Sequence, residues 1–483
     1  MALDSLELSS EEREALGQAA LTWVLRYFAE AGDRTLYPAA SAEDVSSAIA
    51  EPLPRQGQDP LAVLNRFATV AELARNNGHP RMFGYVQSSG NFAAAIGDFL
   101  ASALNQNVTS WRSAPSATTV EHLVVDWIRT LVGCDALGGG LLVGGGSAAN
   151  AAALVVALRA STDIDITTQG VAALPTARVY ASDRVHMSVP KAAALLGLGS
   201  NAVTRISSDD DGRMRVEALA ECLARDRVAG VHQVCVVANA GEVNTGAIDP
   251  LNAIADICDE HRVWLHVDGA YGGFAAAVPD LRDAFAGIER ADSLALDPHK
   301  WLFAPVDAGC LLVRDEQQLR RAFSQGASYI DVVADRQMSE FAFWDVGLEL
   351  SRRFRALKIW FALKCHGADA FVGTIERNVA LARELARAVD ASGDFERLAP
   401  VPLGIVCFRY APVEWRGNEA ALNEFNRRLM VEVQRGGSSY VSNTLLGEAF
   451  ALRACIVNHR TAPGDLGVLL DDIRQAVGRL RAG

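Results

Sequence analysis

The sequence predicts an α/β fold in which helices cover a mostly parallel β-sheet. The first reason is an alternation between about residues 100 and 315, where short apolar runs such as GLLV, ARVYAS and VWLHVD alternate with helix-length segments. The second reason is size, because 483 residues with 50% hydrophobic content can bury a large core. Parallel strands need crossover connections, so the alternation indicates helices on the faces of one sheet.

Two further regions flank the predicted sheet. Residues 1–85 contain the helix-periodic stretches EEREALGQAALTWVLRYFAE and LAVLNRFATVAELARNN, which predict an N-terminal helical arm. Residues 376–483 combine strand-like GIVCFRY and FALRACIV with helix-like EAALNEFNRRLMVEVQR, which predicts a small C-terminal α+β domain. The sheet is therefore expected in a large domain over residues 86–375.

Composition excludes several classes of protein. A net charge of -13 without a cluster of Lys and Arg argues against a nucleic-acid partner. The apolar runs are too short for a membrane span, and the acidic start MALDSLELSSEERE has no apolar signal core. The eight cysteines lack close CxxC pairs, which favours buried free thiols in a reducing compartment. We therefore expect a cytoplasmic protein without a membrane partner.

Glycines follow the first predicted strand where a helix begins. GLLV leads into GGGSAAN, and the N–H groups of Gly145, Gly146 and Ser147 at a helix start suit a bound phosphate. The segment also fits the GxGxxA pattern of dinucleotide-binding proteins, with Asp163 and Asp165 at about the spacing of the ribose-binding acid. Two alternatives therefore stay open: a dinucleotide, although STDIDITTQG is too polar for the strand that should carry the acid, and glycines that only pack a helix against a strand.

A lysine follows a later apolar run, in SLALDPHKWLFAP. Lys300 lies between His299 and Trp301, where the flanking residues indicate burial. Burial disfavours the ammonium, so a buried lysine becomes a usable amine that can bind a carbonyl compound as a Schiff base. The alternative is a strand-end lysine whose ammonium reaches solvent.

Two further strand ends carry ionisable side chains. Asp268 ends VWLHVD before GAYGG, which is small enough for a flat ligand to lie against it. Its carboxylate could pair with a protonated ring nitrogen, or bind a metal with His266, which faces the same way on a strand. One histidine and one aspartate without further ligands nearby argue against a metal. His186 follows ARVYAS just before a helix, where a lone histidine is either functional or structural.

One cofactor accounts for all four strand ends. Pyridoxal 5'-phosphate needs a phosphate site, an amine for its aldehyde and an anion that keeps its ring nitrogen protonated. The glycine segment, Lys300 and Asp268 meet these needs, and His186 adds an imidazole, whereas a dinucleotide accounts only for the glycines. The sequence therefore predicts pyridoxal 5'-phosphate as the cofactor and no metal.

Nine segments spread over nearly the whole chain carry a family resemblance. They are HPRMFGYV, APSATTVE, GGGSAAN, SDRVHMSV, NTGAIDP, HVDGAYGG, DPHKWL, SRRFRALKIWF and LRACIVNHRT. In this order they resemble the group II pyridoxal-phosphate-dependent amino-acid decarboxylases, the family of aromatic-L-amino-acid and glutamate decarboxylases. The resemblance implies fold type I, like aspartate aminotransferase, with a mostly parallel seven-stranded sheet. It also implies a homodimer with a swapped N-terminal arm and shared active sites.

The resemblance assigns roles to the candidate residues. Lys300 would bind the cofactor covalently, Asp268 would pair with its ring nitrogen and His186 would stack on the ring. The other expected cofactor contacts are Gly145, Gly146, Ser147, Ala270, Asp297 and His299. Tyr329, in SYID, lies where such enzymes carry a mobile-loop tyrosine, which would protonate the substrate's α-carbon as a general acid. The alternative for Tyr329 is an ordinary loop aromatic.

The expected substrate pocket departs from the aromatic members of the family. The pocket residues implied by the resemblance are Tyr85, Val86, Asn107, Thr109 and Trp111. Val86 stands where aromatic decarboxylases use an aromatic residue, and Asn107 and Thr109 replace apolar residues. Glu242 and Val243 stand where many relatives carry two threonines, which removes one polar contact to the cofactor. These changes indicate a more polar pocket.

The expected reaction is the decarboxylation of an L-amino acid to its amine and CO2, with an aromatic amino acid as the first expectation. One alternative is an acidic or other polar substrate. Another is an aldehyde-forming or lyase-type pyridoxal enzyme. The distant alternative is a dinucleotide-dependent oxidoreductase that uses GGGSAA.

Overall fold

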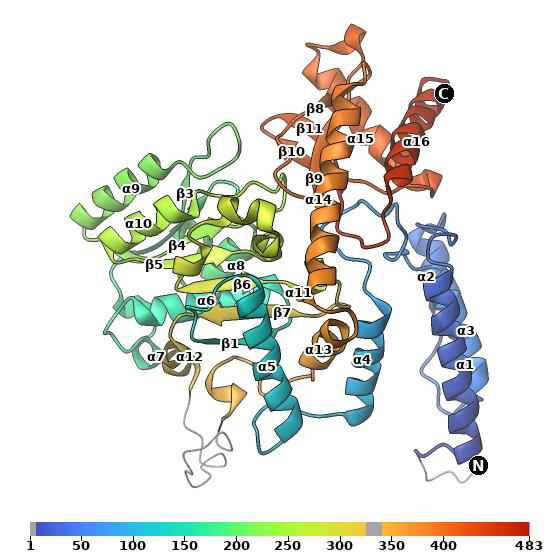
Figure 1. Cartoon of the computed structure of the whole chain (residues 1–483), viewed down its shortest axis with the longest axis horizontal. Coiled ribbons are helices and arrows are strands. Elements are labelled where there is room, and N and C mark those ends of the chain that lie inside the picture. Colours follow the sequence, from blue (N-terminus) through green and yellow to red (C-terminus); the bar gives the residue numbers. More distant parts are fainter. Residues whose placement is uncertain (1–5, 325–340, 483) are drawn as a thin grey trace.

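The computed structural model describes residues 6–324 and 341–482 and shows a large α/β layer structure beside a smaller domain and an outer helical arm (Figure 1). Within these ranges no helix combines the length and the apolar character needed to cross a bilayer. The cytoplasmic location expected from the sequence stays a prediction. All eight cysteines are free, and only Cys365 is exposed, so the expected burial of the thiols is wrong for that residue.

The central element is a seven-stranded sheet. Its strands are β1 (Gly139–Val143), β2 (Ala177–Ser182), β3 (Val203–Ile206), β4 (His232–Asn239), β5 (Trp264–Asp268), β6 (Ser293–Leu296) and β7 (Gly309–Val313). They are ordered β1-β7-β6-β5-β4-β2-β3, and only β7 runs antiparallel to its neighbours. This topology confirms the predicted mostly parallel sheet of fold type I.

Helices cover both faces of this sheet. They are α4 (Phe92–Leu104), α5 (Pro115–Leu131), α6 (Gly146–Ala160), α7 (Ile166–Gln169), α8 (Ser188–Leu195), α9 (Val216–Val228), α10 (Leu251–His261), α11 (Pro298–Trp301), α12 (Glu316–Phe323) and α13 (Ala356–His366). Alternate residues of β4 enter opposite layers: Cys235 and Val237 pack with α6 and α8, whereas Val236 and Ala238 belong to the core that includes α9 and α10. Burial on both faces explains why the strands are nearly continuous apolar runs.

Short 3-10 turns complete the connections. The described turns are η1 (Val171–Ala173), η2 (Ser200–Ala202), η3 (Gly273–Ala277), η4 (Pro279–Phe285), η5 (Ile288–Arg290), η7 (Phe343–Asp345) and η8 (Val413–Trp415). The turns η3 to η5 join β5 to β6, which are parallel neighbours. They take the place of the longer helices used in the other crossovers.

The small C-terminal domain has its own sheet and core. Strands β8 (Phe395–Arg397), β9 (Ile405–Tyr410), β10 (Ser442–Leu446) and β11 (Ala449–Cys455) form an antiparallel sheet in the order β10-β11-β9-β8, with helices α14 (Ala368–Asp390), α15 (Glu419–Gly436) and α16 (Pro463–Ala482). Helix α14 serves both cores, because Ile375 packs in the large one and Leu385 in the small one. The expected boundary after residue 375 therefore falls inside a helix, and the three domain limits stay predictions.

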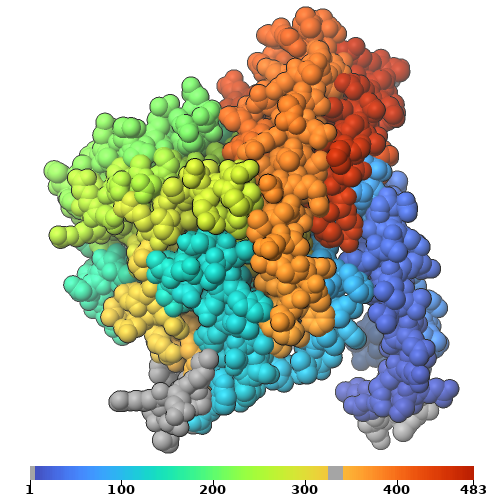
Figure 2. Space-filling model, viewed as in Figure 1, coloured from blue at the N-terminus to red at the C-terminus, as the bar shows by residue number. Residues whose placement is uncertain are grey.

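The N-terminal arm consists of α1 (Ser10–Ala29), α2 (Ala42–Ile49) and α3 (Pro60–Glu72). Helices α1 and α3 pack against each other, with the Trp23 and Phe67 rings 5.0 Å apart, and form a column along one side of the molecule (Figure 2). None of the residues in these three helices is buried, and Leu25 and Val63 are about half exposed. The arm thus leaves apolar side chains uncovered.

Candidate functional site

A cavity of about 360 Å³ opens at the carboxyl ends of the central strands. In register, Asn239 at the end of β4 pairs with Asp268 at the end of β5, which pairs with Ala295 near the end of β6. Polar side chains after these strands therefore converge, as expected for an open α/β sheet. The lining residues are Gly144, Gly145, Gly146, Ser147, Asn150, His186, Asn239, Gly241, Glu242, Val243, Asp268, Ala270, Tyr271, Asp297, His299, Lys300 and Val306.

The glycine segment brings backbone close to the rest of the cavity. Gly145 has a φ of 131°, which side-chain-bearing residues rarely adopt. At Gly146, the first residue of α6, an added Cβ would lie 2.8 Å from Ala270 Cβ and 2.9 Å from Asp297 Oδ2. The helix start can approach these groups only because it carries no side chain, and its N–H groups are suited to an anion.

Lys300 lies in the short helix α11, three residues after Asp297. Its Nζ is 2.9 Å from Asp297 Oδ2, and its side chain retains 18% exposure. Asp297 is 2% exposed, and its Oδ1 is buried without a hydrogen-bond partner among the described residues. The ion pair thus satisfies one carboxylate oxygen and leaves the other with unused acceptor capacity beside the cavity.

Asp268 is held by donors on both carboxylate oxygens. Asn150 Nδ2 donates to Oδ2 at 2.7 Å, and the Ala270 N–H donates to Oδ1 at 3.1 Å. Asp268 is 7% exposed, so its carboxylate is both buried and hydrogen-bonded on each oxygen. Such a group can hold a cationic ring nitrogen.

His186 precedes α8 and lies in the same cavity. The Ser188 N–H donates to its Nδ1 at 3.2 Å, and Ser188 Oγ lies 2.8 Å from the same atom. Burial lowers the pKa of His186, against an opposing contribution from Asp268, so the imidazole is neutral near pH 7.

His299 is fixed in a similar way. Its Nδ1 accepts a hydrogen bond from the Ala308 N–H at 3.2 Å, and its Nε2 lies 3.6 Å from Asp297 Oδ2. Burial lowers the pKa of His299 as well. Both cavity histidines therefore present neutral rings.

The structure gathers one group of expected residues and leaves another apart. The residues expected to bind the cofactor all line the cavity: Gly145, Gly146, Ser147, His186, Asp268, Ala270, Asp297, His299 and Lys300. Their individual roles stay predictions. Tyr329 lies outside the described residues.

The expected substrate residues do not line this cavity within one chain. They are Tyr85, Val86, Asn107, Thr109 and Trp111, and none of them is among its described lining residues. Asn107 Oδ1 accepts a hydrogen bond from the Arg352 N–H at 2.8 Å, and the Thr109 carbonyl accepts one from the Phe343 N–H at 2.8 Å. Tyr85 is 48% exposed. Their assignment to the substrate pocket stays a prediction.

Sequence reasoning missed Asn150 and assigned no role to Glu242. Asn150 lies one helical turn after Gly146, a spacing that places both on the same side of α6 and could have indicated it. Glu242 is buried, and its Oε2 accepts the Asn244 N–H at 2.7 Å while its Oε1 accepts the Thr245 N–H at 2.5 Å. Glu242 therefore stabilises the turn of its own loop and also lines the cavity.

Two alternatives find no support in the geometry. No group of three or more metal-ligating side chains occurs among the described residues, and both His266 and Asp268 are hydrogen-bonded to Asn150. Asp163 and Asp165 precede the short helix α7 instead of ending a strand. The acid that a dinucleotide ribose needs at a strand end is therefore missing from this segment.

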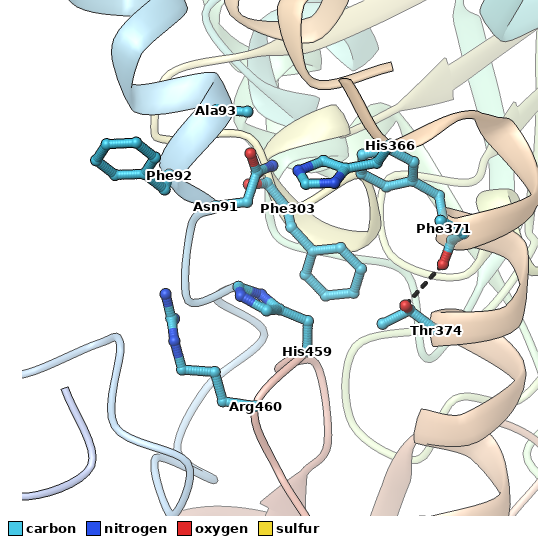
Figure 3. Close-up of a pocket in the computed structure, with 10 residues that line it drawn as sticks. Asn91, Phe92, Ala93, Phe303, His366, Phe371, Thr374, His459 and Arg460 are labelled. Atoms are coloured by element: carbon cyan, nitrogen blue, oxygen red, sulfur yellow. Dashed lines mark hydrogen bonds between the residues drawn. The ribbon is translucent and has the colours of Figure 1, made fainter. Parts of the chain in front are cut away.

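A second cavity, of about 330 Å³, lies between the start of α4 and helices α13 and α14. Figure 3 shows His459 and Arg460 beside Phe303, with Thr374 bonded within α14. Its lining shares no residue with the first cavity and contains no lysine or carboxylate. It therefore offers histidine side chains but neither an amine for a Schiff base nor a carboxylate for a ring nitrogen.

Comparisons with known proteins agree with this geometry. Residues 46–411 match the pyridoxal-dependent decarboxylase conserved domain. The chain is 36% identical over 466 residues to an aromatic-L-amino-acid decarboxylase of Bacillus atrophaeus, covering 96% of this chain and 95% of that protein. It is 31% identical to a phenylacetaldehyde synthase of Arabidopsis thaliana, over 78% of this chain and 77% of that protein. The crystal structure of mouse CSAD superposes with a TM-score of 0.91 at 29% identity, covering 97% of this chain and 99% of that chain.

Proposed function

Because the chain belongs to the pyridoxal-dependent decarboxylase family and is therefore a pyridoxal-phosphate-dependent carboxy-lyase, we propose that it converts an aromatic L-amino acid into the corresponding amine and CO2. The observation that carries the proposal is the cavity that joins Lys300, Asp268 and His186 to the glycine-rich start of α6. The choice of an aromatic substrate rests on the similarity to the Bacillus atrophaeus decarboxylase over nearly the whole chain.

The residues of the cavity fit pyridoxal 5'-phosphate. The start of α6 at Gly146 offers N–H groups to a phosphate, and Asp268 offers a buried carboxylate to a ring nitrogen. Asp297 Oδ1 is a buried acceptor still without a partner. When bound, the cofactor supplies an aldehyde for covalent capture of the amino acid and a ring that accepts electrons.

Each of these residues of the chain would have a separate role. Lys300 Nζ would hold the cofactor covalently, and Asp297 Oδ2, 2.9 Å away, would position this amine. Asp268 is oriented by two donors that bind its oxygens, and its carboxylate would stabilise positive charge on a ring nitrogen. His186, which lines the same cavity, would lie against the ring and orient the substrate carboxylate. The protonation of the α-carbon by Tyr329 stays a prediction from the resemblance.

A panel of L-amino acids tests the choice of substrate. We expect aromatic amino acids to give equimolar CO2 and amine, because the chain is similar over nearly its whole length to an aromatic-L-amino-acid decarboxylase. Acidic and sulfur-containing amino acids should react more slowly, and the amine should exceed any aldehyde in the product mixture. Faster CO2 release from an acidic substrate would favour the polar alternative, and aldehyde with peroxide as the main products would favour the aldehyde-forming one.

A homodimer with shared active sites accounts for two observations at once. Helices α1 and α3 bury none of their residues within the chain, so their apolar side chains need a partner surface. The expected substrate residues, such as Asn107 and Thr109, do not line the cavity of their own chain. In a shared site these residues would complete the cavity of the partner.

Sedimentation tests this assembly. The active enzyme should sediment at twice the 51.6 kDa mass of the chain. Deleting residues 1–80 should expose the surface that the arm covers and cause aggregation. An active monomer at the assay concentration, or a well-behaved active truncation, would contradict the shared site.

A further inference from the structure

A buried amide connects two ionisable groups that line the cavity, Asp268 and His186. Asn150 is 1% exposed, and its Nδ2 lies 2.7 Å from Asp268 Oδ2 and 2.9 Å from Ser188 Oγ. Ser188 Oγ in turn lies 2.8 Å from His186 Nδ1. The amide has two hydrogens, and each has one acceptor within reach.

The direction of these hydrogen bonds follows from the acceptors. Asp268 Oδ2 can only accept, so the nitrogen of the Asn150 amide must face it and the amide oxygen must face away. That oxygen lies 2.9 Å from His266 Nε2, which therefore carries a proton. If the amide were flipped, the Asn150 oxygen and Asp268 Oδ2, both acceptors, would lie 2.7 Å apart.

His266 is locked in the matching tautomer. It is fully buried, and burial lowers its pKa to about 4, so the ring carries one proton near pH 7. With this proton on Nε2, Nδ1 accepts from Ser293 Oγ at 2.9 Å. Trp264 Nε1 donates to the same hydroxyl at 2.9 Å, which leaves the Ser293 hydrogen free for the ring. The chain of donors thus runs in one direction from Trp264 to Asp268.

The second hydrogen of the Asn150 amide determines the direction of the hydrogen bonds that lead to His186. Ser188 Oγ accepts from Asn150, so its own hydrogen is available to His186 Nδ1. The Ser188 backbone N–H also donates to Nδ1, which makes this atom an acceptor. The neutral imidazole of His186 then carries its proton on Nε2.

From these contacts we infer that Asn150 is a positioning residue that orients the carboxylate of Asp268 and, through Ser188, fixes the imidazole of His186, with His266 setting the orientation of the Asn150 amide. The inference rests on the proposed function in that Asp268 and His186 face the cofactor. One amide therefore links the carboxylate that would face a ring nitrogen to the imidazole that would lie against the ring. Asn150 itself is given no chemical step.

The test replaces Asn150 by leucine, which has the same branching but no donor. The full-length variant is compared with wild type by the dissociation constant for pyridoxal 5'-phosphate and by the 15N NMR shift of bound cofactor labelled at its ring nitrogen. We expect the dissociation constant to rise by about 10- to 100-fold, the scale of one hydrogen bond to a charged group. The ring-nitrogen signal should move toward the unprotonated position, because Asp268 loses the donor that holds its carboxylate in place.

Ser188→Ala is the matched control, because it cuts only the branch to His186. It should leave the dissociation constant and the ring-nitrogen signal as in wild type, while kcat falls a few-fold. Neither binding readout requires turnover, so a failure to decarboxylate aromatic amino acids would overturn the proposed function without touching this inference. A folded Asn150→Leu variant with wild-type affinity and a wild-type ring signal would overturn the inference.

A second pair of variants keeps the test decisive if Asn150→Leu does not fold. His266→Gln retains a donor for the Asn150 oxygen, whereas His266→Leu removes it. We expect the glutamine variant to keep wild-type cofactor affinity and the leucine variant to lose it in the same direction as Asn150→Leu. Equal affinities for both His266 variants and wild type would contradict the orienting role.

Discussion

Lys300→Ala is expected to abolish decarboxylation while the fold stays intact. The amine is the covalent attachment point, and no neighbouring group can replace it, because the cavity lining contains no other lysine. The expected fall in kcat is roughly 10⁴-fold or more, the scale seen when one member of a catalytic unit is removed. Amine formation measured over long incubations tests this result, with a thermal unfolding curve to show that the variant is folded.

Lys191→Ala is the matched control for the lysine. Lys191 lies on α8, close in sequence to His186, but its side chain is exposed and does not line the cavity. Its removal should leave turnover unchanged. Appreciable decarboxylation by the Lys300 variant, or an equal loss in both variants, would show that the attachment point is misassigned.

Asp268→Asn is expected to bind the cofactor more weakly, to retain it at saturating cofactor concentration, and to lose most of its activity. A neutral amide cannot hold the positive charge of a ring nitrogen, and breaking a buried charge pair costs about 3–5 kcal/mol, which corresponds to at least about 100-fold in rate. The amide also has one acceptor where Asn150 and the Ala270 N–H now find two, so one donor loses its partner. We therefore expect some loss of thermal stability as well.

Three measurements on one preparation check the aspartate prediction: cofactor content by absorbance, kcat with the best amino acid, and the midpoint of thermal unfolding. Ser293→Ala serves as a control, because it changes a buried polar residue that is three hydrogen bonds away from Asp268, through His266 and Asn150. Its loss of activity should be much smaller. Unchanged turnover of Asp268→Asn with full cofactor content would rule out the proposed charge pair.

The sequence predicted the elements that the backbone pattern controls. Apolar runs at the spacing of parallel strands gave the sheet, and the rule that ligands gather at strand ends singled out Asp268 and Lys300 before any contact was known. Those two residues do reach one cavity, together with the glycines before α6. This part succeeded because strand ends of a parallel sheet converge whatever the details of packing.

Other features depend on contacts that a linear pattern does not encode. Asn150 faces Asp268 only because α6 packs across β5, and the sequence separation of the two residues hides the contact. The antiparallel direction of β7 and the position of α14 between two cores are likewise set by packing. The role of residues such as Asn107 stays a prediction, because the single chain does not include the partner subunit whose active site they would complete.

Reductive trapping tests the central claim most directly. The chain has four lysines, Lys191, Lys300, Lys358 and Lys364, so the attachment point can be mapped without ambiguity. Lys191 and Lys364 are exposed, and Lys358 is buried with its Nζ donating to the Pro305 carbonyl at 3.1 Å. After borohydride reduction of the cofactor-loaded enzyme and proteolysis, mass spectrometry should find the pyridoxyl group on the peptide that contains Lys300. A pyridoxyl group on any of the other three lysines, or on none, would contradict the assignment of this cavity as the decarboxylase active site.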